Sequence, residues 1–376
     1  MSTTEGTRER FARLGVYAGA FLGPFGGGIT VAMLPELGVS FAVSPATASV
    51  SITAYLLPFA AVQLVSGTLG ERWGRRRTVI GGYALYVVAS VACVLAPTLT
   101  LFVAARAMQG VANAFTTPLL LAALAAATQP ERLGRALGWF GSLQAAGQTS
   151  APLLGGLAAE VEWRAAFVAV ALVGVGLGIV GIPAGAAPNG RPSLRTAMRP
   201  EVLRIGVVAA LGAGCLAGLA FLVALRLEDQ FDVGAGTRGL VLTGMGVAGL
   251  LTARMVGARV DTVGPRRSIL LGTAIGALAV AGAGLAPDVW MIAVIWTAGG
   301  VATQLVLVGV NTLVLRSTAG NTGGSMSVVQ AVRFGGSALS PVAVTPIYHT
   351  DPVAGFLIPA ALMAAFIPVA LPRNPK

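Results

Sequence analysis

The sequence is poor in charged residues, in histidine and in cysteine. Charged residues occupy only 10% of the 376 positions, and there are one histidine and two cysteines. Because a soluble domain has about a quarter of its residues charged, this composition excludes an ordinary soluble protein. The two cysteines, Cys93 and Cys215, both lie in apolar runs, so neither a disulfide framework nor a metal-ligand or nucleophile cluster is expected. We therefore expect no enzyme activity and no cofactor.

Long apolar runs dominate the chain instead. Hydrophobic residues make up 55% of it, 51 residues are glycine, and the mean hydropathy is +0.81. A helix needs about 20 mostly apolar residues to cross a bilayer, and glycine lets such helices approach closely. By this measure the sequence predicts an all-α membrane protein with twelve spans, at 14–34, 49–70, 78–96, 99–126, 134–158, 164–183, 203–226, 238–258, 268–286, 289–314, 324–346 and 353–371.

The positive charges are distributed unevenly among the loops. Most of the 25 lysines and arginines fall before the first span, after the last, or in loops on that same side, whereas the opposite loops hold only Arg164, Arg226 and Arg238. Such a bias places both termini in the cytoplasm of a multi-pass protein of the plasma (inner) membrane. The formal charge of +11 is therefore a topology signal that points to the lipid bilayer, and no nucleic-acid partner is expected.

One short charged segment occurs twice. Residues 67–77 read GTLGERWGRRR and residues 257–267 read GARVDTVGPRR, each between two apolar runs. Other glycines and prolines correspond at almost the same offset, Gly110 with Gly300 and Pro152 with Pro341. The chain is thus expected to consist of two pseudo-symmetric six-helix bundles, residues 1–183 and 203–376, joined by a cytoplasmic linker at 184–202.

At these residues the chain resembles the major facilitator superfamily, in its twelve-helix drug/proton antiporter (multidrug efflux) branch. The first charged segment is similar to the family's motif A, and the resemblance implies a latch that holds one conformation and breaks in the other. The residues that carry it in the two copies are Gly67, Leu69, Gly70, Glu71, Arg72, Gly74, Arg75, Arg76, Gly257, Asp261, Gly264, Arg266 and Arg267. Glu71 stands where the family usually has aspartate. A plain charged topology anchor is the alternative.

Two further motifs point to the same branch. Arg106, Gln109 and Gly110 are similar to motif B, which implies a role for Arg106 in proton handling or in stabilising the central cavity. The fifth span is similar to the antiporter motif that is characteristic of exporters, with Ala151 in place of one glycine; its matching residues are Gly138, Gly147, Pro152, Gly155 and Gly156. Ordinary packing of small residues is the alternative for this span.

No acidic residue is expected in the middle of the membrane. Proton-coupled carriers usually use a buried carboxylate, and the nearest acids are Glu36, Glu228 and Asp229 near the outer ends of spans one and seven. Proton coupling therefore rests on the resemblance.

The substrate is expected to lie between the halves. Candidate lining residues are Phe21, Phe25, Asn113, Phe115, Phe221, Trp296, Gln304, Asn311 and Arg333, although each of them is also compatible with helix packing. An apolar wall with few polar groups suits a neutral or weakly anionic lipophilic compound. We expect a monomeric transporter that exports such small molecules by alternating access in exchange for protons. An uptake permease or uniporter for a small metabolite is the alternative.

Overall fold

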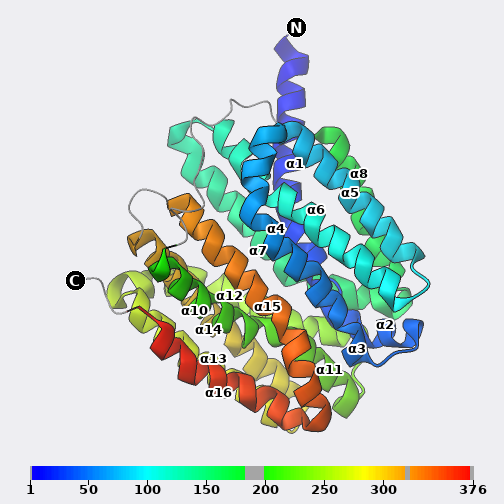
Figure 1. Cartoon of the computed structure of the whole chain (residues 1–376), viewed down its shortest axis with the longest axis vertical. Coiled ribbons are helices and arrows are strands. Elements are labelled where there is room, and N and C mark those ends of the chain that lie inside the picture. The colour runs from blue at the N-terminus through cyan, green and yellow to red at the C-terminus, as the bar shows by residue number, and fades with distance from the viewer. Residues whose placement is uncertain (1, 183–198, 318–321, 373–376) are drawn as a thin grey trace.

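The protein is built from helices in two groups. The computed structural model describes residues 2–182, 199–317 and 322–372, and every regular element in these ranges is a helix. Figure 1 shows one group, α1 to α8, at the upper right and the other, α10 to α16, at the lower left. The first group consists of α1 (Ser2–Gly28), η1 (Val31–Met33), α2 (Leu34–Phe41), α3 (Pro45–Ala48), α4 (Val50–Trp73), α5 (Arg75–Leu95), α6 (Leu99–Ala126), α7 (Pro130–Val161) and α8 (Arg164–Val180).

The second group follows residues 183–198, so the predicted linker at 184–202 lies mostly outside the described residues. The boundaries of the two halves stay a prediction. This group consists of α10 (Pro200–Gly214), η2 (Ala217–Leu219), α11 (Ala220–Phe231), α12 (Ala235–Val263), α13 (Pro265–Leu285), α14 (Val289–Ser317), α15 (Thr322–Thr350) and α16 (Pro352–Ala370).

The helices have the lengths that a bilayer requires. Nine stretches of the described chain are long and apolar enough to cross a membrane, and α8 is a shorter apolar helix of 17 residues. In the long helices α7 and α15, glycine and polar residues stand between the apolar ones, and the mean hydropathy of these two helices is therefore lower. Together these elements make the twelve helices expected from the sequence, and the all-α membrane class is confirmed.

The first and seventh spans differ from the prediction because both are broken. We expected one continuous helix at 14–34 and another at 203–226. Instead α1 ends at Gly28 and a 3₁₀ turn leads into α2, and α10 ends at Gly214 before a similar turn leads into α11. Pro35 lies in the first turn of α2, where its missing amide hydrogen costs nothing, but it could not continue the preceding helix. The breaks extend both spans, and Glu36 and Arg226 are therefore in helices rather than in loops.

Close helix packing through glycine recurs in both halves. A side chain at Gly110 in α6 would overlap the Tyr55 carbonyl oxygen in α4, and one at Gly300 in α14 would overlap the Met245 carbonyl oxygen in α12. In the same way, Gly147 in α7 lies against the backbone of α1, as Gly336 in α15 does against α10. In these contacts the backbone of one helix packs directly against the backbone of another, which only small residues allow.

The two halves meet through α7 against α12 and α4 against α15. Gly156 abuts the Ala235 carbonyl oxygen, and the Thr53 hydroxyl donates to the Ala338 carbonyl oxygen at 2.5 Å. These contacts lie toward the end of the molecule that carries α2, α3 and α11, which we call the α2 end (Figure 1). The other end, which carries the turns at Gly74 and Gly264, is called the hinge end.

Candidate functional site

The two charged segments fold in the same way at the hinge end. Gly74 and Gly264 both have φ of +90°, a conformation that glycine adopts without strain, and a new helix starts immediately after each. In both halves, a hydroxyl at the start of that helix donates a hydrogen bond to the carbonyl oxygen of this glycine. Thr78 donates to the Gly74 carbonyl oxygen at 3.1 Å, and Ser268 donates to the Gly264 carbonyl oxygen at 2.9 Å. The sequence repeat is thus a structural repeat.

Arginines of these segments bind the carbonyl ends of neighbouring helices. Arg75 donates to the Ala122 carbonyl oxygen at 3.2 Å, and Arg266 donates to those of Leu371, at 3.3 Å, and Pro372. Such contacts suit the negative end of the helix dipole. The latch members Arg72, Arg76, Arg267 and Asp261 are exposed, and Gly70 lies against Leu119.

The predicted latch is not assembled around Gly257. A side chain at this position would meet no atom within 4 Å. The surroundings of Gly67 and the side chain of Glu71 lie outside the described part of the structure. The latch therefore stays a prediction.

Arg106 is fully buried inside the first half. It donates to the Gly26 carbonyl oxygen at 2.9 Å and to Gln109 Oε1 at 2.7 Å, and its guanidinium lies 4.4 Å from the centre of the Tyr55 ring. Gln109 donates in turn to Ser90 at 2.8 Å. The residues expected for motif B are thus brought together, and they hold the broken end of α1 against α6. Their part in proton handling stays a prediction.

The glycine and proline pattern of α7 contacts both halves. Gly147 and Gly155 lie against the carbonyl oxygens of Phe21 and Ile29 in the first half, whereas Gly156 lies against Ala235 in the second. The Pro152 carbonyl oxygen occupies the space beside Gly239, again across the boundary. This helix therefore packs against α1 and α12 at once. The surroundings of Gly138 lie outside the described residues.

A cluster of three charged side chains joins the halves at the α2 end. Arg238, whose side chain is only 1% exposed, forms ion pairs with Glu36 of the first half and Glu228 of the second. It also donates to the carbonyl oxygens of Ala32 at 3.2 Å and Val233 at 2.7 Å. We expected Arg238 in an exposed loop, and that prediction is wrong because α12 already starts at Ala235. No local pattern shows that these three residues meet.

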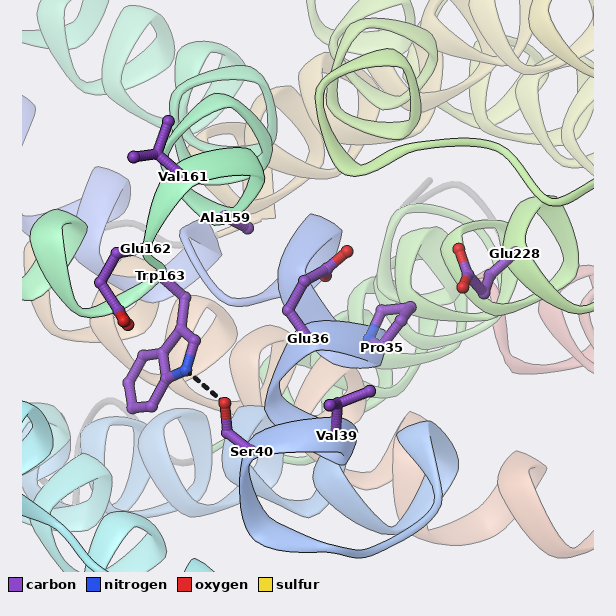
Figure 2. A pocket seen from close by; sticks show the side chains of 9 residues that line it. All are labelled: Pro35, Glu36, Val39, Ser40, Ala159, Val161, Glu162, Trp163 and Glu228. Carbon is purple, nitrogen blue, oxygen red and sulfur yellow. Dashed lines mark hydrogen bonds between the residues drawn. The ribbon is translucent and has the colours of Figure 1, made fainter.

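The same cluster borders a surface hollow of about 310 Å³. Figure 2 shows Glu36 and Glu228 at one side of it and Glu162 beside Trp163 at the other, with the indole donating to Ser40 at 2.8 Å. The lining residues are Pro35, Glu36, Val39, Ser40, Ala159, Val161, Glu162, Trp163 and Glu228. Both halves thus contribute to this hollow.

A row of aromatic rings connects two arginines in the middle of the helices. Arg106 lies over Tyr55, Tyr55 stacks on Phe59 at 6.4 Å, and Phe59 meets Phe334 edge-on at 5.0 Å across the boundary between the halves. The guanidinium of Arg333 lies 4.5 Å from the centre of the Phe334 ring. The row therefore passes from α6 through α4 to α15.

The predicted cavity residues differ in their exposure. Asn113, Phe221 and Trp296 are buried. Phe21, Phe25, Phe115, Gln304, Asn311 and Arg333 are partly exposed. Asn113 bonds to the Tyr55 hydroxyl at 2.9 Å, and the Trp296 indole nitrogen has no hydrogen-bond partner. Their lining of a substrate cavity stays a prediction.

Known proteins share both the sequence pattern and the fold. The chain is 38% identical to the uncharacterized MFS-type transporter EfpA of Mycobacterium tuberculosis over 154 residues, 40% of this chain and 28% of EfpA. It is 34% identical to the drug efflux pump JefA of the same organism over 175 residues, 46% of this chain and 34% of JefA. The chain thus spans about a third of the length of these curated relatives.

Two solved structures have the same architecture over nearly the whole chain. The human organic anion transporter MFSD10 superposes with a TM-score of 0.71 at 16% identity, covering 97% of this chain and 99% of that one. A bacterial homologue of the human lysosomal transporter Spinster, in an inward-facing and unoccupied conformation, has the same TM-score and identity, covering 99% and 95%. At this identity the likeness concerns the fold alone.

The sequence itself also matches a family model. The model described as Major Facilitator Superfamily covers residues 16–256, well over half of the chain. The matched residues run from α1 into α12 and so include parts of both halves. The chain therefore belongs to the Major Facilitator Superfamily, a family of membrane transporters rather than enzymes.

Proposed function

We propose that the chain exports small lipophilic compounds from the cytoplasm by alternating access, in exchange for protons. It would act as a monomer in the plasma (inner) membrane with both termini cytoplasmic. The similarity to the drug efflux pump JefA and the exporter-type pattern of α7 support the direction of transport. The arginine-rich hinge end supports the orientation, because positive loops stay in the cytoplasm.

One observation carries this proposal: the named contacts between the halves gather at the α2 end, while a Cβ atom added at Gly257, at the hinge end, would meet no described atom within 4 Å. With the hinge end cytoplasmic, this is a conformation closed to the outside. Release of a compound outward then requires the contacts at the α2 end to separate. These contacts are glycine to backbone, single hydrogen bonds and one ion cluster, all of which can break and re-form.

Glu36 is the carboxylate that we propose for proton exchange. The Glu36 carboxylate pairs with Arg238 of the opposite half, so separation of the halves removes this partner. The ion cluster has two carboxylates for one guanidinium, and one of the two oxygens of Glu36 is buried without a hydrogen bond. Proton exchange at Glu36 would thus be tied to opening of the α2 end.

The test uses a neutral lipophilic fluorescent dye, Nile red, in a host that lacks its own efflux pumps. The wild-type chain is expected to export Nile red and to stop when the proton gradient is collapsed. Gly156→Ala places a Cβ atom against the Ala235 carbonyl oxygen of α12 and is expected to abolish export, whereas the Cβ atom of Gly141→Ala on the same helix meets no described atom within 4 Å and is expected to preserve it. If the two variants export equally well, the proposed transport cycle is contradicted. Export that persists without a proton gradient contradicts proton coupling.

A further inference from the structure

Arg333 differs from the other buried arginines in having no hydrogen-bond partner. Arg106 and Arg238 each bond to carbonyl oxygens, and Arg226 bonds to those of Ala283 and, at 2.8 Å, Ala286. Within residues 2–182, 199–317 and 322–372, no described acid or carbonyl oxygen binds Arg333, and its Nε is buried without a partner. Its contact in this structure is the face of the Phe334 ring.

Arg333 lies near the middle of α15, which corresponds to the predicted eleventh span. It follows the start of α15 by about 17 Å, at a rise of 1.5 Å per residue, in a helix of 29 residues. A charged side chain at this depth is costly in lipid and is tolerated where it faces the interior of the bundle or a water-filled cavity. An arginine retained there without a protein partner is an indication of a functional role.

The neighbours of Arg333 along α15 define where it points. Gly336 and Ser340 contact α10, with the Ser340 hydroxyl donating to the Gly214 carbonyl oxygen at 2.7 Å. Phe334 and Ala338 contact α4 of the other half. At about 100° per residue, Arg333 lies between these two faces and opposite Val342, which is 54% exposed on the lipid side. The guanidinium therefore faces the space between the two halves.

Other groups on this face of α15 complete a binding site for a ligand. Gln330, one turn away, has a buried Oε1 without a partner, and both it and Arg333 remain partly accessible. The Phe334 ring lies beside the guanidinium, and Phe59 of the other half meets the Phe334 ring edge-on. A planar guanidinium binds a carboxylate or sulfonate through two parallel hydrogen bonds, and aromatic rings suit an apolar body.

We propose that Arg333 is the recognition group for an amphiphilic organic anion, a carboxylate or sulfonate attached to an apolar body. The anion binds the guanidinium, and the apolar body packs on Phe334 and Phe59 between the halves. This proposal rests on the proposed function for the identification of the anion as a transported substrate. The binding site itself does not depend on the direction of transport or on proton coupling.

The test compares two probes that differ only in the charged group, pyrenebutyrate and pyrenebutanol. The full chain is placed in nanodiscs of phosphatidylcholine, and binding is measured by energy transfer from tryptophan to pyrene, with empty nanodiscs subtracted. The wild-type chain is expected to bind pyrenebutyrate at least about tenfold more tightly, which corresponds to about 1.4 kcal/mol. Arg333→Met is expected to remove this preference and to leave the affinity for pyrenebutanol within about twofold.

Two further variants and one stability measurement separate recognition from packing. Arg333→Lys keeps the charge but not the fork and is expected to retain part of the preference. Arg254→Met, which changes an exposed arginine near the hinge end, is expected to behave like the wild type. Because Arg333 has no partner to lose, Arg333→Met is expected to unfold at or above the wild-type temperature.

The proposal is overturned if the wild type shows no preference for the carboxylate or if the preference survives Arg333→Met. It is also overturned if Arg333→Met unfolds at a clearly lower temperature and weakens both probes equally, since that result assigns Arg333 to packing. If Arg333→Met does not fold, loss of the preference in Arg333→Gln decides in the same way. Nile red export by Arg333→Met tests the proposed function separately, because Nile red carries no anionic group.

Discussion

The ion cluster at the α2 end provides a test of how strongly the halves are held together. Replacing Glu36 by glutamine removes one of the two carboxylates that bind Arg238 and leaves Glu228 in place. A hydrogen bond to a charged group contributes about 1.5–3 kcal/mol, and the lower value applies because Arg238 keeps a partner. A change of about 1.5 kcal/mol corresponds to a roughly tenfold shift of the equilibrium toward separated halves.

The distance between the halves is the measurement that reports this shift. Spin labels at Val39 and Trp290, both exposed, mark the two halves at the α2 end in a chain whose Cys93 and Cys215 are replaced by alanine. We expect Glu36→Gln to increase the population at long distance by about tenfold relative to the unmodified cluster.

One control variant and one stronger variant test how this change in the distance distribution is interpreted. Glu162→Gln borders the same hollow but its ion pair is with Arg164 of its own half, so the distance distribution is expected to stay unchanged. Arg238→Gln leaves two carboxylates without a partner, and removing one member of a buried pair costs about 3–5 kcal/mol. Distributions that are identical in Glu36→Gln, Arg238→Gln and the unmodified chain would refute a holding role for the cluster.

Two further predictions concern stability. Gly74→Ala places a methyl group on a residue with φ of +90°, so we expect a loss of about 1–2 kcal/mol and a lower unfolding temperature; a temperature equal to that of wild type would show that the turn relaxes without strain. The Cβ atom of Gly110→Ala overlaps the backbone of α4 and is expected to cost about 1–3 kcal/mol or more, whereas the Cβ atom of Gly81→Ala meets no described atom within 4 Å and is expected not to destabilise in the same thermal unfolding assay. Equal temperatures for these two variants would contradict close packing of α4 and α6.

The repeated elements could be predicted from the sequence because each depends on local requirements. Gly74 and Gly264 close their helices by a backbone conformation that favours glycine, and Gly110 and Gly300 occupy positions where any side chain would overlap a carbonyl oxygen. Apolar runs of membrane length predict the helices for the same reason. These features are therefore visible in one stretch of residues at a time.

The breaks and the ion cluster could not be predicted because they depend on distant partners. Arg226 and Arg238 read as loop residues in the sequence, since nothing nearby shows the carbonyl oxygens and carboxylates that satisfy them inside a helix. The pairing of Glu36 with Arg238 joins residues from opposite halves. Only the packing of α2 against α11 and of η1 against α11 and α12 brings them together.

The contacts of Gly110, Gly147, Gly300 and Gly336 all have a main-chain carbonyl oxygen as the partner. A main-chain atom is the same whichever amino acid supplies it, so substitution of the partner residue does not alter the fit. The architecture can thus tolerate extensive sequence divergence while a few small residues remain. This tolerance accounts for a shared fold, with a TM-score of 0.71, at only 16% identity, and it leaves the side chains between the halves free to diversify toward new compounds.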